Sequence, residues 1–221
     1  MNIGSKDWND LIIDSCREFG ADISPEQCGL LARHAEELLR WNRKVNLTAI
    51  TEPQEVAVKH YIDSLIALPF IPAGAKVLDM GTGGGFPGLP LKIAVPSLSL
   101  TLLDSVRKKI SFLQFVIRSL QLKEAEAIHS RAEELALKPG YRGEFDIVIC
   151  RALTDLGVFA DMALPFLKSG GKQIALKGKI TEEEMAPVRL RMHTDVEKYV
   201  LPVFKAERTV LIMKAKERIG E

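Results

Sequence analysis

The chain has 221 residues, and its 30 Lys and Arg against 29 Asp and Glu leave a formal charge of only +1 at pH 7. With 47% hydrophobic and 27% charged residues, it has a globular composition, which excludes the disordered, collagen-like and disulfide-scaffold classes. No apolar run approaches the roughly 18 residues that a membrane span needs, and Met1–Asp10 is too polar for a secretory signal. We therefore expect a cytoplasmic protein with no membrane partner.

The cysteine content and the net charge bear on whether the chain binds a metal or a nucleic acid. Cys16, Cys28 and Cys150 have neither the number of a disulfide framework nor the close spacing of a zinc site, so no metal is expected. Because the net charge is nearly zero, a nucleic acid would have to be bound by a local basic patch. We expect the chain to act as a monomer.

The first 70 residues have the periodicity of helices. Apolar residues recur at helical spacing between Trp8 and Phe19, and Ser24-Pro25-Glu26-Gln27 is a capping signature that starts a second helix. Thr51-Glu52-Pro53-Gln54 repeats the start signal, and the helix that follows should end at Pro69 and Pro72. The sequence thus predicts an N-terminal helical cap over residues 1–72.

From Lys76 onward, short apolar runs alternate with helical stretches, which predicts an α/β domain over residues 73–221 with a parallel sheet covered on both faces. The last two expected strands have no helix between them, so they should form a closing hairpin. The expected strands are Lys76–Met80, Leu98–Leu103, Ala125–His129, Phe145–Cys150, Lys172–Lys177, Val196–Phe204 and Thr209–Lys214, and the expected helices between them are Gly88–Ala94, Val106–Leu120 and Asp155–Leu167.

A glycine-rich loop follows the first expected strand and is the sharpest signal in the chain. The loop has an Asp-x-Gly-x-Gly-x-Gly pattern, formed by Asp79, Gly81, Gly83 and Gly85. Glycines allow positive φ and close approach of a ligand to the backbone, and the helix after the loop directs N–H groups toward it. Asp104 ends the next strand, where a carboxylate can accept the ribose hydroxyls of a nucleoside. The alternatives without a bound cofactor are a glycine-rich turn that binds no ligand and, for Asp104, a residue that only caps the next helix.

Two nucleotide cofactors suit this pattern. Gly83-x-Gly85-x-x-Gly88 also fits the dinucleotide fingerprint of dehydrogenases. The carboxylate of Asp79 would repel a pyrophosphate, but it suits the ammonium of an amino-acid group, directly or through water. S-adenosylmethionine has that ammonium beside an adenosine, so methyl transfer is favoured over hydride transfer.

From about Trp41 to its end, the chain resembles the RsmG (GidB) family of class I S-adenosylmethionine-dependent methyltransferases. The resemblance implies a Rossmann-like seven-stranded sheet whose last strand is antiparallel. It also implies methylation of guanine N7 in 16S ribosomal RNA, as the free RNA or the small ribosomal subunit. Cys150 departs from the serine that is more usual there. The matching segments are Trp41–Thr48, Lys59–Ser64, the glycine loop with Phe86-Pro87-Gly88, Leu103-Asp104-Ser105, Ser130-Arg131-Ala132-Glu133, Cys150-Arg151-Ala152 and Leu176-Lys177-Gly178.

The expected site residues fall into two groups. Arg151 and Lys177 lie at the ends of neighbouring strands, where they can donate to guanine O6. His60 and Asp63 share a helical face and are expected at the mouth of the pocket, although a lone helical histidine is more often structural. Arg208 is expected to contact RNA phosphate or brace the site, and the alternative is a solvated charge at the sheet edge. The residues expected at the reaction centre are Arg151, Lys177, Asn46, His60, Asp63 and Arg208. Those expected to bind the cofactor are Asp79, Gly81, Thr82, Gly83, Gly85, Phe86, Asp104, Ser105, Arg131, Ala132, Glu133 and Arg151.

The expected chemistry needs no catalytic base, because N7 of guanine has a free lone pair; catalysis is then positioning. The Asp/Asn-Pro-Pro-aromatic signature of amino-group methyltransferases is absent after Cys150, and Cys150 as a nucleophile toward pyrimidine C5 is a minor alternative. A small-molecule methyltransferase and a non-catalytic nucleotide- or RNA-binding protein remain open. Cations that could bind RNA are Arg40, Arg43, Lys44, Lys59, Arg107, Lys108, Lys109, Lys177 and Lys179.

Overall fold

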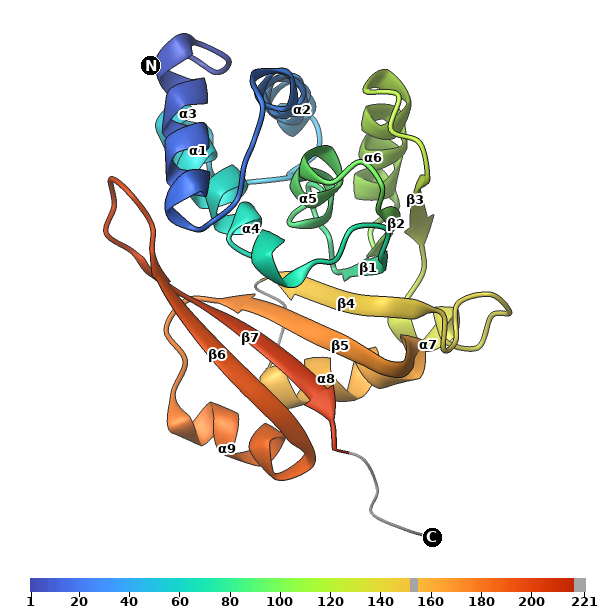
Figure 1. The fold of residues 1–221 in the computed structure, drawn as a ribbon. Helices are drawn as coiled ribbons and strands as arrows, with labels where there is room; N and C mark the ends of the chain where they lie inside the picture. The colour runs from blue at the N-terminus through green and yellow to red at the C-terminus, as the bar shows by residue number, and fades with distance from the viewer. Residues whose placement is uncertain (152–154, 217–221) are drawn as a thin grey trace, which may run out of the picture.

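A seven-stranded sheet organises the computed structural model, which describes residues 1–151 and 155–216 (Figure 1). Its strand order is β3-β2-β1-β4-β5-β7-β6. Neighbours from β3 to β5 pair in parallel, whereas β7 is antiparallel to both β5 and β6. This confirms the predicted sheet with its reversed last strand. The strands are β1 (Lys76–Met80), β2 (Ser99–Asp104), β3 (Ala125–His129), β4 (Phe145–Arg151), β5 (Leu167–Lys177), β6 (Met192–Val200) and β7 (Glu207–Ala215).

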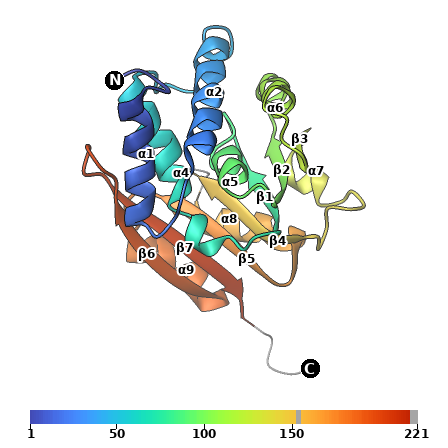
Figure 2. The ribbon, with the colours of Figure 1, turned by 45° about the horizontal axis from the view of Figure 1, so that its top comes forward.

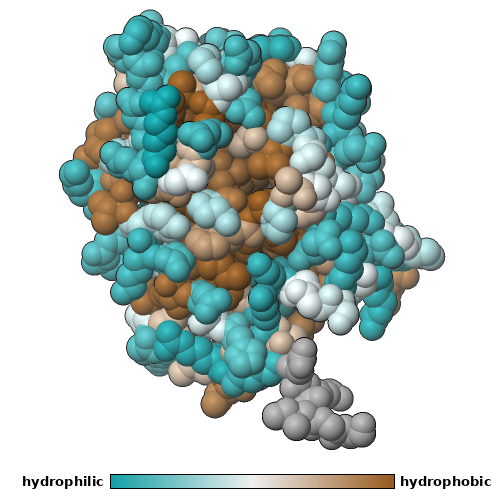
Figure 3. All heavy atoms as spheres, in the orientation of Figure 1, coloured by the Kyte–Doolittle hydropathy of each residue, from teal (hydrophilic) through white to brown (hydrophobic). Residues whose placement is uncertain are grey.

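Helices cover both faces of the sheet (Figures 1 and 2). One face packs against α1 (Lys6–Glu18), α2 (Pro25–Asn42), α5 (Gly88–Ala94), α6 (Arg107–Ser119) and a helical run of α3 (Pro53–Val56), η1 (Ala57–Ile62), α4 (Asp63–Leu65) and η2 (Leu68–Phe70). The other face packs against α7 (Ala132–Leu135), α8 (Leu156–Ala163), η3 (Leu164–Phe166) and α9 (Glu182–Arg191). On the side seen in Figure 3, hydrophilic side chains cover the periphery and hydrophobic ones gather near the centre. No helix within the described ranges is long and apolar enough to cross a bilayer.

The N-terminal helices share one core with the sheet. Trp8 and Leu31 of these helices lie in the same buried cluster as Val77 and Leu100 of β1 and β2. Gln27 completes the predicted capping box at the start of α2, and its amide also donates to the carbonyls of Ile93 (3.0 Å) and Ala94 (2.8 Å) at the end of α5. The helices are thereby fixed against the α/β domain, while the division at residue 72 stays a prediction.

Most predicted elements are confirmed, with β1, β3 and α5 ending at the predicted residues. Several boundaries were wrong, and β6 begins at Met192 instead of Val196. β5 begins at Leu167 instead of Lys172, so the helix expected to reach Leu167 ends as α8 at Ala163, followed by the short η3. β6 ends at Val200, and Phe204 therefore lies in a turn instead of a strand. Ala152 of the Cys150-Arg151-Ala152 segment lies outside the described residues.

Two helical features were not predicted from the sequence. The third helix is a series of short segments whose middle part, η1, has π-helical hydrogen bonding. Such turns are frequent at functional sites; this one contains His60 and is followed directly by Asp63 at the start of α4. The second feature is α9, which the sequence analysis missed because only Met185 and Val188 of it are buried and Pro187 interrupts the pattern.

Candidate active site

Two adjoining hollows lie where the parallel strands end. The first, named here the Asp104 hollow, has a volume of about 370 Å³ and is lined by Met80, Gly81, Leu103, Asp104, Ser105, Val106, Lys109, Ser130, Arg131, Ala132, Glu133 and Met162. The second, the Arg151 hollow, has a volume of about 510 Å³ and is lined by Leu47, Ile50, Lys59, His60, Asp63, Gly81, Thr82, Gly83, Gly84, Phe86, Arg151, Leu176, Lys177, Gly178, Lys179 and Arg208. Gly81 lines both, so the glycine loop separates them.

Most of the predicted site residues line one of these hollows. Asp104, Ser105, Arg131, Ala132 and Glu133 line the first. The second brings together Thr82, Gly83 and Phe86 of the glycine loop with five side chains from five different elements, which are His60, Asp63, Arg151, Lys177 and Arg208. Asn46, Asp79 and Gly85 are not among the lining residues of either hollow.

The carboxylate of Asp79 lies beneath the glycine loop and shapes it. The side chain is fully buried, and its Oδ2 accepts from the Thr82 hydroxyl (2.6 Å) and from the backbone N–H of Gly88 (2.8 Å). Its Oδ1 is buried and has no partner among the described residues. Burial raises the pKa of Asp79 to about 6, and the hydrogen bonds from Thr82 and Gly88 oppose that shift. One acceptor atom therefore stays available under the loop.

Asp104 fastens the other side of the loop. Its Oδ2 accepts from the backbone N–H of Gly83 (3.0 Å), and its Oδ1 accepts from the N–H of Val106 (2.8 Å) at the start of α6. The Lys109 ammonium lies 3.6 Å from Oδ2. The capping role and the ribose role that the sequence analysis weighed are compatible here, since each carboxylate oxygen has two lone pairs.

The glycines of the loop are required for different reasons. Gly81, Gly83 and Gly85 all have positive φ. A Cβ on Gly85 would lie 2.5 Å from Leu89 Cδ1, and one on Gly88 would lie 2.7 Å from Asp79 Oδ2, so packing excludes a side chain at both. A Cβ on Gly83 would meet nothing within 4 Å. Space is left open at Gly83, on the wall of the Arg151 hollow.

Arg151 is the centre of a hydrogen-bonded cluster at the end of β4. Its Nη1 donates to the carbonyl of Lys59 (2.7 Å) and to Asp63 Oδ2 (3.2 Å). The guanidinium carbon lies 5.0 Å from the centre of the Phe86 ring. Asp63 also accepts from Arg208 Nε through its Oδ1 (2.7 Å), so one buried carboxylate orients both arginines. Burial lowers the pKa of Arg151, and Asp63 counteracts that effect.

His60 is held neutral and has a defined tautomer. Its Nδ1 lies 3.1 Å from Arg151 Nη2, which can only donate, so Nδ1 is the acceptor. The Nε2–H then donates to Thr48 Oγ1 (2.8 Å). Burial and the Arg151 charge lower the pKa of His60 to about 3, and its ring stacks on Phe86 at 4.5 Å. Both imidazole nitrogens are engaged, so His60 positions its neighbours and does not accept protons.

The remaining predicted residues are placed less centrally. Lys177 forms an ion pair with Glu184 of α9, which neutralises its charge at the hollow. Asn46 is exposed in the loop after α2 and lies near the site only through its neighbours Leu47 and Thr48. The side chain that organises that loop is Asn42, whose amide binds the backbone of Leu47 and Thr48. Cys150 is only 3% exposed, packs in the core below the sheet and lines neither hollow.

His34 of α2 is a residue that the sequence analysis missed. It is fully buried; its Nε2 donates to the carbonyl of Gly84 (3.0 Å), and its Nδ1 accepts from the Tyr61 hydroxyl (3.1 Å). Burial lowers the pKa of His34 to about 4. The signal was in the sequence, because His34 lies three residues after Leu31 and four before Leu38, within the apolar stripe of the helix. The neutral imidazole connects the cap to the glycine loop.

These features fit a cofactor that joins a nucleoside to an amino acid. The Asp104 hollow offers a carboxylate to a sugar, the loop at Gly83 leaves space for close approach, and the unpartnered Asp79 Oδ1 can accept from an ammonium directly or through water. A dinucleotide would bring a pyrophosphate over that same carboxylate, where like charges repel. The donor set therefore favours S-adenosylmethionine over a nicotinamide dinucleotide.

The fold is shared with solved proteins of low sequence identity. It superimposes on a SAM-dependent methyltransferase from Aquifex aeolicus with a TM-score of 0.56 at 16% identity, covering 81% of this chain and 97% of that one. The YcgJ protein from Bacillus subtilis gives a TM-score of 0.57 at 14% identity, covering 73% and 100%. The chain thus has the fold of the class I S-adenosylmethionine-dependent methyltransferases.

Sequence comparison identifies the family within that class. The GidB family model, described as rRNA small subunit methyltransferase G, matches residues 27–214. Proteins named ribosomal RNA small subunit methyltransferase G from Acetivibrio thermocellus and Lachnoclostridium phytofermentans are 40% and 44% identical to it, covering 92% and 93% of this chain and 87% and 88% of their own lengths. The chain belongs to the rRNA small subunit methyltransferase G family, which confirms the resemblance seen in the sequence.

Alanine at two glycines should separate cofactor binding from folding. Gly83→Ala places a methyl group in the Arg151 hollow and should weaken S-adenosylmethionine binding at least about ten-fold, or ~1.4 kcal/mol, while the positive φ costs about 1–2 kcal/mol of stability. Gly85→Ala should lower the thermal midpoint further, because its Cβ collides with Leu89. Calorimetric titration and thermal unfolding measure the two effects. Equal losses of affinity and stability in both variants would contradict this division.

Cofactor affinity should rise with pH between about 5 and 7. Burial raises the pKa of Asp79 from 3.8 to about 6, so the folded protein binds this proton more tightly than the unfolded chain does. The resulting contribution to stability is fully present below the pKa of the unfolded chain and is lost as the pH rises through about 6. An ammonium prefers the ionised carboxylate and should therefore bind more tightly above pH 6. Isothermal titration with S-adenosylmethionine measures this slope. Asp79→Asn should bind weakly and flatten the slope; an unchanged slope in that variant would show that another group titrates.

Proposed function

We propose that this chain transfers the methyl group of S-adenosylmethionine to N7 of a guanine in 16S ribosomal RNA. The family is that of the small-subunit ribosomal RNA methyltransferases, and S-adenosylmethionine is the methyl donor of its fold class. The observation that best supports the position of the reaction is the Arg151 hollow, which borders the glycine loop and is lined by cationic side chains. Its cations are Lys59, Arg151, Lys177, Lys179 and Arg208. Each forms an ion pair, Lys59 with Glu55, Lys177 with Glu184, Lys179 with Glu207 and both arginines with Asp63.

The proposed cofactor position spans the two hollows across Gly81. Asp104 would accept from the ribose hydroxyls, and Ser105 with Arg131, Ala132 and Glu133 would surround the adenine in the Asp104 hollow. The amino-acid end would lie over the loop near Asp79, Thr82 and Gly83. When bound, the cofactor supplies an electrophilic methyl group on a sulfonium. In this position the methyl group would lie on the side of the Arg151 hollow that Phe86 and Arg151 line.

A guanine in the Arg151 hollow would contact hydrogen-bond donors and would find no proton-accepting catalytic residue among those that the structure describes. Arg151 uses both hydrogens of Nη1 and one of Nη2 within the cluster, which leaves its Nε–H and one Nη2–H for a ligand among the interactions of the described residues. Guanine O6 is an acceptor next to N7, and arginine is the usual partner of that edge. The N7 lone pair needs no deprotonation, which agrees with a neutral His60 whose nitrogens are both engaged.

The charge distribution supports RNA over a small molecule as the substrate. An enclosed apolar pocket is what a small-molecule methyltransferase needs, whereas the Arg151 hollow is lined by charged side chains, five cationic ones and the carboxylate of Asp63. Among the described residues, the exposed side chains of Arg43, Lys44, Arg107 and Lys108 have no ion-pair partner. They lie at the end of α2 and the start of α6 and are free to bind phosphates. We expect weak binding to short naked RNA and a need for folded ribosomal substrate.

The function is tested by the identity of the product. Small ribosomal subunits and their purified RNA, taken from cells that lack this activity, are incubated with labelled S-adenosylmethionine and digested to nucleosides. Mass spectrometry should detect 7-methylguanosine. A different methylated nucleoside would overturn the N7 assignment, and equal methylation of a short oligonucleotide would contradict the need for folded substrate.

Arg151→Lys should lower methyl transfer while sparing cofactor binding. Lysine keeps the positive charge for Asp63, but it cannot bridge Asp63, His60 and a guanine with one planar group. We expect the rate at saturating S-adenosylmethionine to fall about a hundred-fold, as positioning losses do, with a cofactor dissociation constant within about three-fold of the parent. Arg189→Lys, at an exposed ion pair with Glu182 on α9, is the matched control. Equal weakening of cofactor binding by Arg151→Lys would place this side chain in the cofactor site.

A further inference from the structure

The connection between β6 and β7 is a strained turn. Leu201 N–H donates to the carbonyl of Ala206 (2.9 Å) and closes the hairpin, and Phe204 N–H donates to the carbonyl of Pro202 (2.6 Å). Val203, between these last two residues, has a φ of 63°, and Lys205 has a φ of 49°. A hydrogen bond across one residue of positive φ is the mark of a classic γ-turn, which is rare.

Valine is an unfavourable residue for this conformation. A β-branched side chain at positive φ is a true outlier, and such conformations are unfavourable and concentrate at binding sites. Leu201 is fully buried beneath the turn and anchors it. The turn therefore has a rigid base and a strained end, and it presents Val203 and Phe204 outward, at 46% and 38% exposure.

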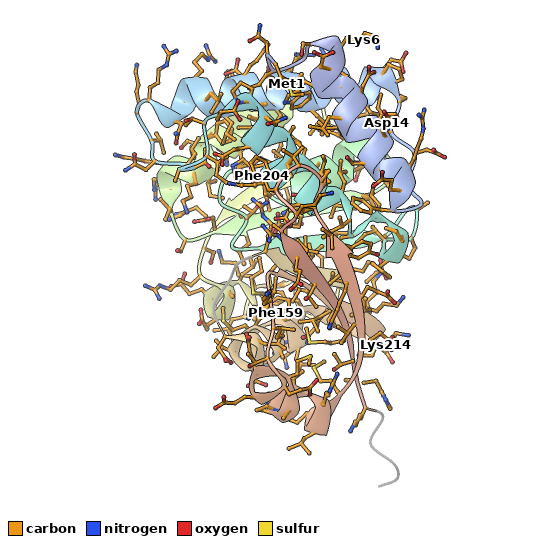
Figure 4. The ribbon with its side chains drawn as sticks, turned by 90° about the vertical axis from the view of Figure 1, so that its left-hand side faces the viewer. Met1, Lys6, Asp14, Phe159, Phe204 and Lys214 are labelled. Atoms are coloured by element: carbon orange, nitrogen blue, oxygen red, sulfur yellow. The ribbon has the colours of Figure 1, made fainter. Side chains whose placement is uncertain are left out.

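The turn lies beside the Arg151 hollow. The Lys59 ammonium is 4.6 Å from the centre of the Phe204 ring, and the carbonyl of the same Lys59 accepts from Arg151. Four residues after Phe204, Arg208 reaches into the hollow and binds Asp63. Figure 4 shows Phe204 at the end of the hairpin, next to the helical segment that contains Lys59. An exposed aromatic ring thus borders the proposed substrate site.

The charged residues of this region indicate which kind of partner could bind at Phe204. Lys205 follows Phe204 in the chain, and Lys198 lies further along β6, in a separate hollow with Arg208 and Glu207. Both lysines are exposed and have no ion pair among the described residues. Lys59 and Lys179 are each paired with a single carboxylate, Glu55 and Glu207. Apolar and aromatic groups among cations are the chemistry that binds single-stranded nucleic acid, where bases stack on rings and phosphates meet ammonium groups. An acidic, unstacked strand fits here better than a second copy of this nearly neutral chain.

We propose that Phe204 stacks against the base of a nucleotide next to the target guanine, with Lys205 near its phosphate. The inference rests on the proposed function, since it takes RNA as the substrate. When the target guanine leaves its stack to enter the Arg151 hollow, its neighbours lose a stacking partner. The Phe204 ring replaces that partner and holds the strand at the mouth of the hollow.

Binding and catalysis are measured together to test this surface. Affinity for unmodified small ribosomal subunits is measured by filter binding, and KM and kcat for methyl transfer are measured in parallel. Phe204→Ala should weaken subunit binding and raise KM by about five- to hundred-fold, as loss of one stacked base does, with unchanged cofactor affinity and thermal midpoint. Phe204→Trp should retain binding, and Phe204→Leu, which is apolar but has no π face, should bind as weakly as alanine. Leu190→Ala, at an exposed apolar residue of α9, is the control.

The outcomes separate this inference from the proposed function. Unchanged subunit binding in Phe204→Ala would overturn the stacking surface even if 7-methylguanosine is formed. Lost binding in Phe204→Ala together with a different methylated nucleoside would support the surface and overturn the N7 assignment. Full rescue by Phe204→Leu would show a plain apolar contact, and a change in sedimentation with unchanged RNA binding would show a protein contact. Either result would contradict the proposal.

Discussion

The site depends on holding a glycine-rich loop in one shape from both sides. Glycines bring conformational freedom, and this freedom has to be removed before the loop can present a fixed surface. Asp79 accepts from Thr82 and Gly88 below the loop, Asp104 accepts from Gly83 beside it, and His34 donates to Gly84 from the cap. Because these partners come from β1, β2 and α2, the loop is only as ordered as the packing of cap against sheet.

The same contacts connect the cap to the candidate active site. Phe86 follows the glycines and packs against His34 and Tyr61 of the cap. His60 stacks on the same ring and binds Arg151, so the loop and the guanidinium are connected through the cap. A ligand that moves the loop must therefore also move the wall of the Arg151 hollow. In this arrangement the cap holds the glycine loop and Arg151 in place. The groups that would contact the cofactor and the RNA lie at the ends of the strands.

The fold and most of the site were predictable because their signals are local. The apolar run of β1, the glycines after it and the acid at the end of β2 lie within one stretch of chain, and their spacing specifies the loop. The pairing of Asp63 with Arg208 was beyond sequence reasoning, since 145 positions separate them and only the return of β7 to the sheet joins them. The π-helical turn at η1 and the strained turn at Val203 violate local preferences, so no propensity predicts them. The role of Asn42 was not predicted, because the loop that it organises has no periodic signal.

The central claim is that one nucleoside cofactor lies across Gly81, with its sugar in the Asp104 hollow and its sulfur facing Arg151. A crystal structure of the chain with S-adenosylhomocysteine tests it most directly. The account predicts ribose hydroxyls at Asp104, the amino group over the Asp79 loop and the sulfur open to the Arg151 hollow. A ribose bound away from Asp104, or a sulfur turned away from Arg151, would contradict it.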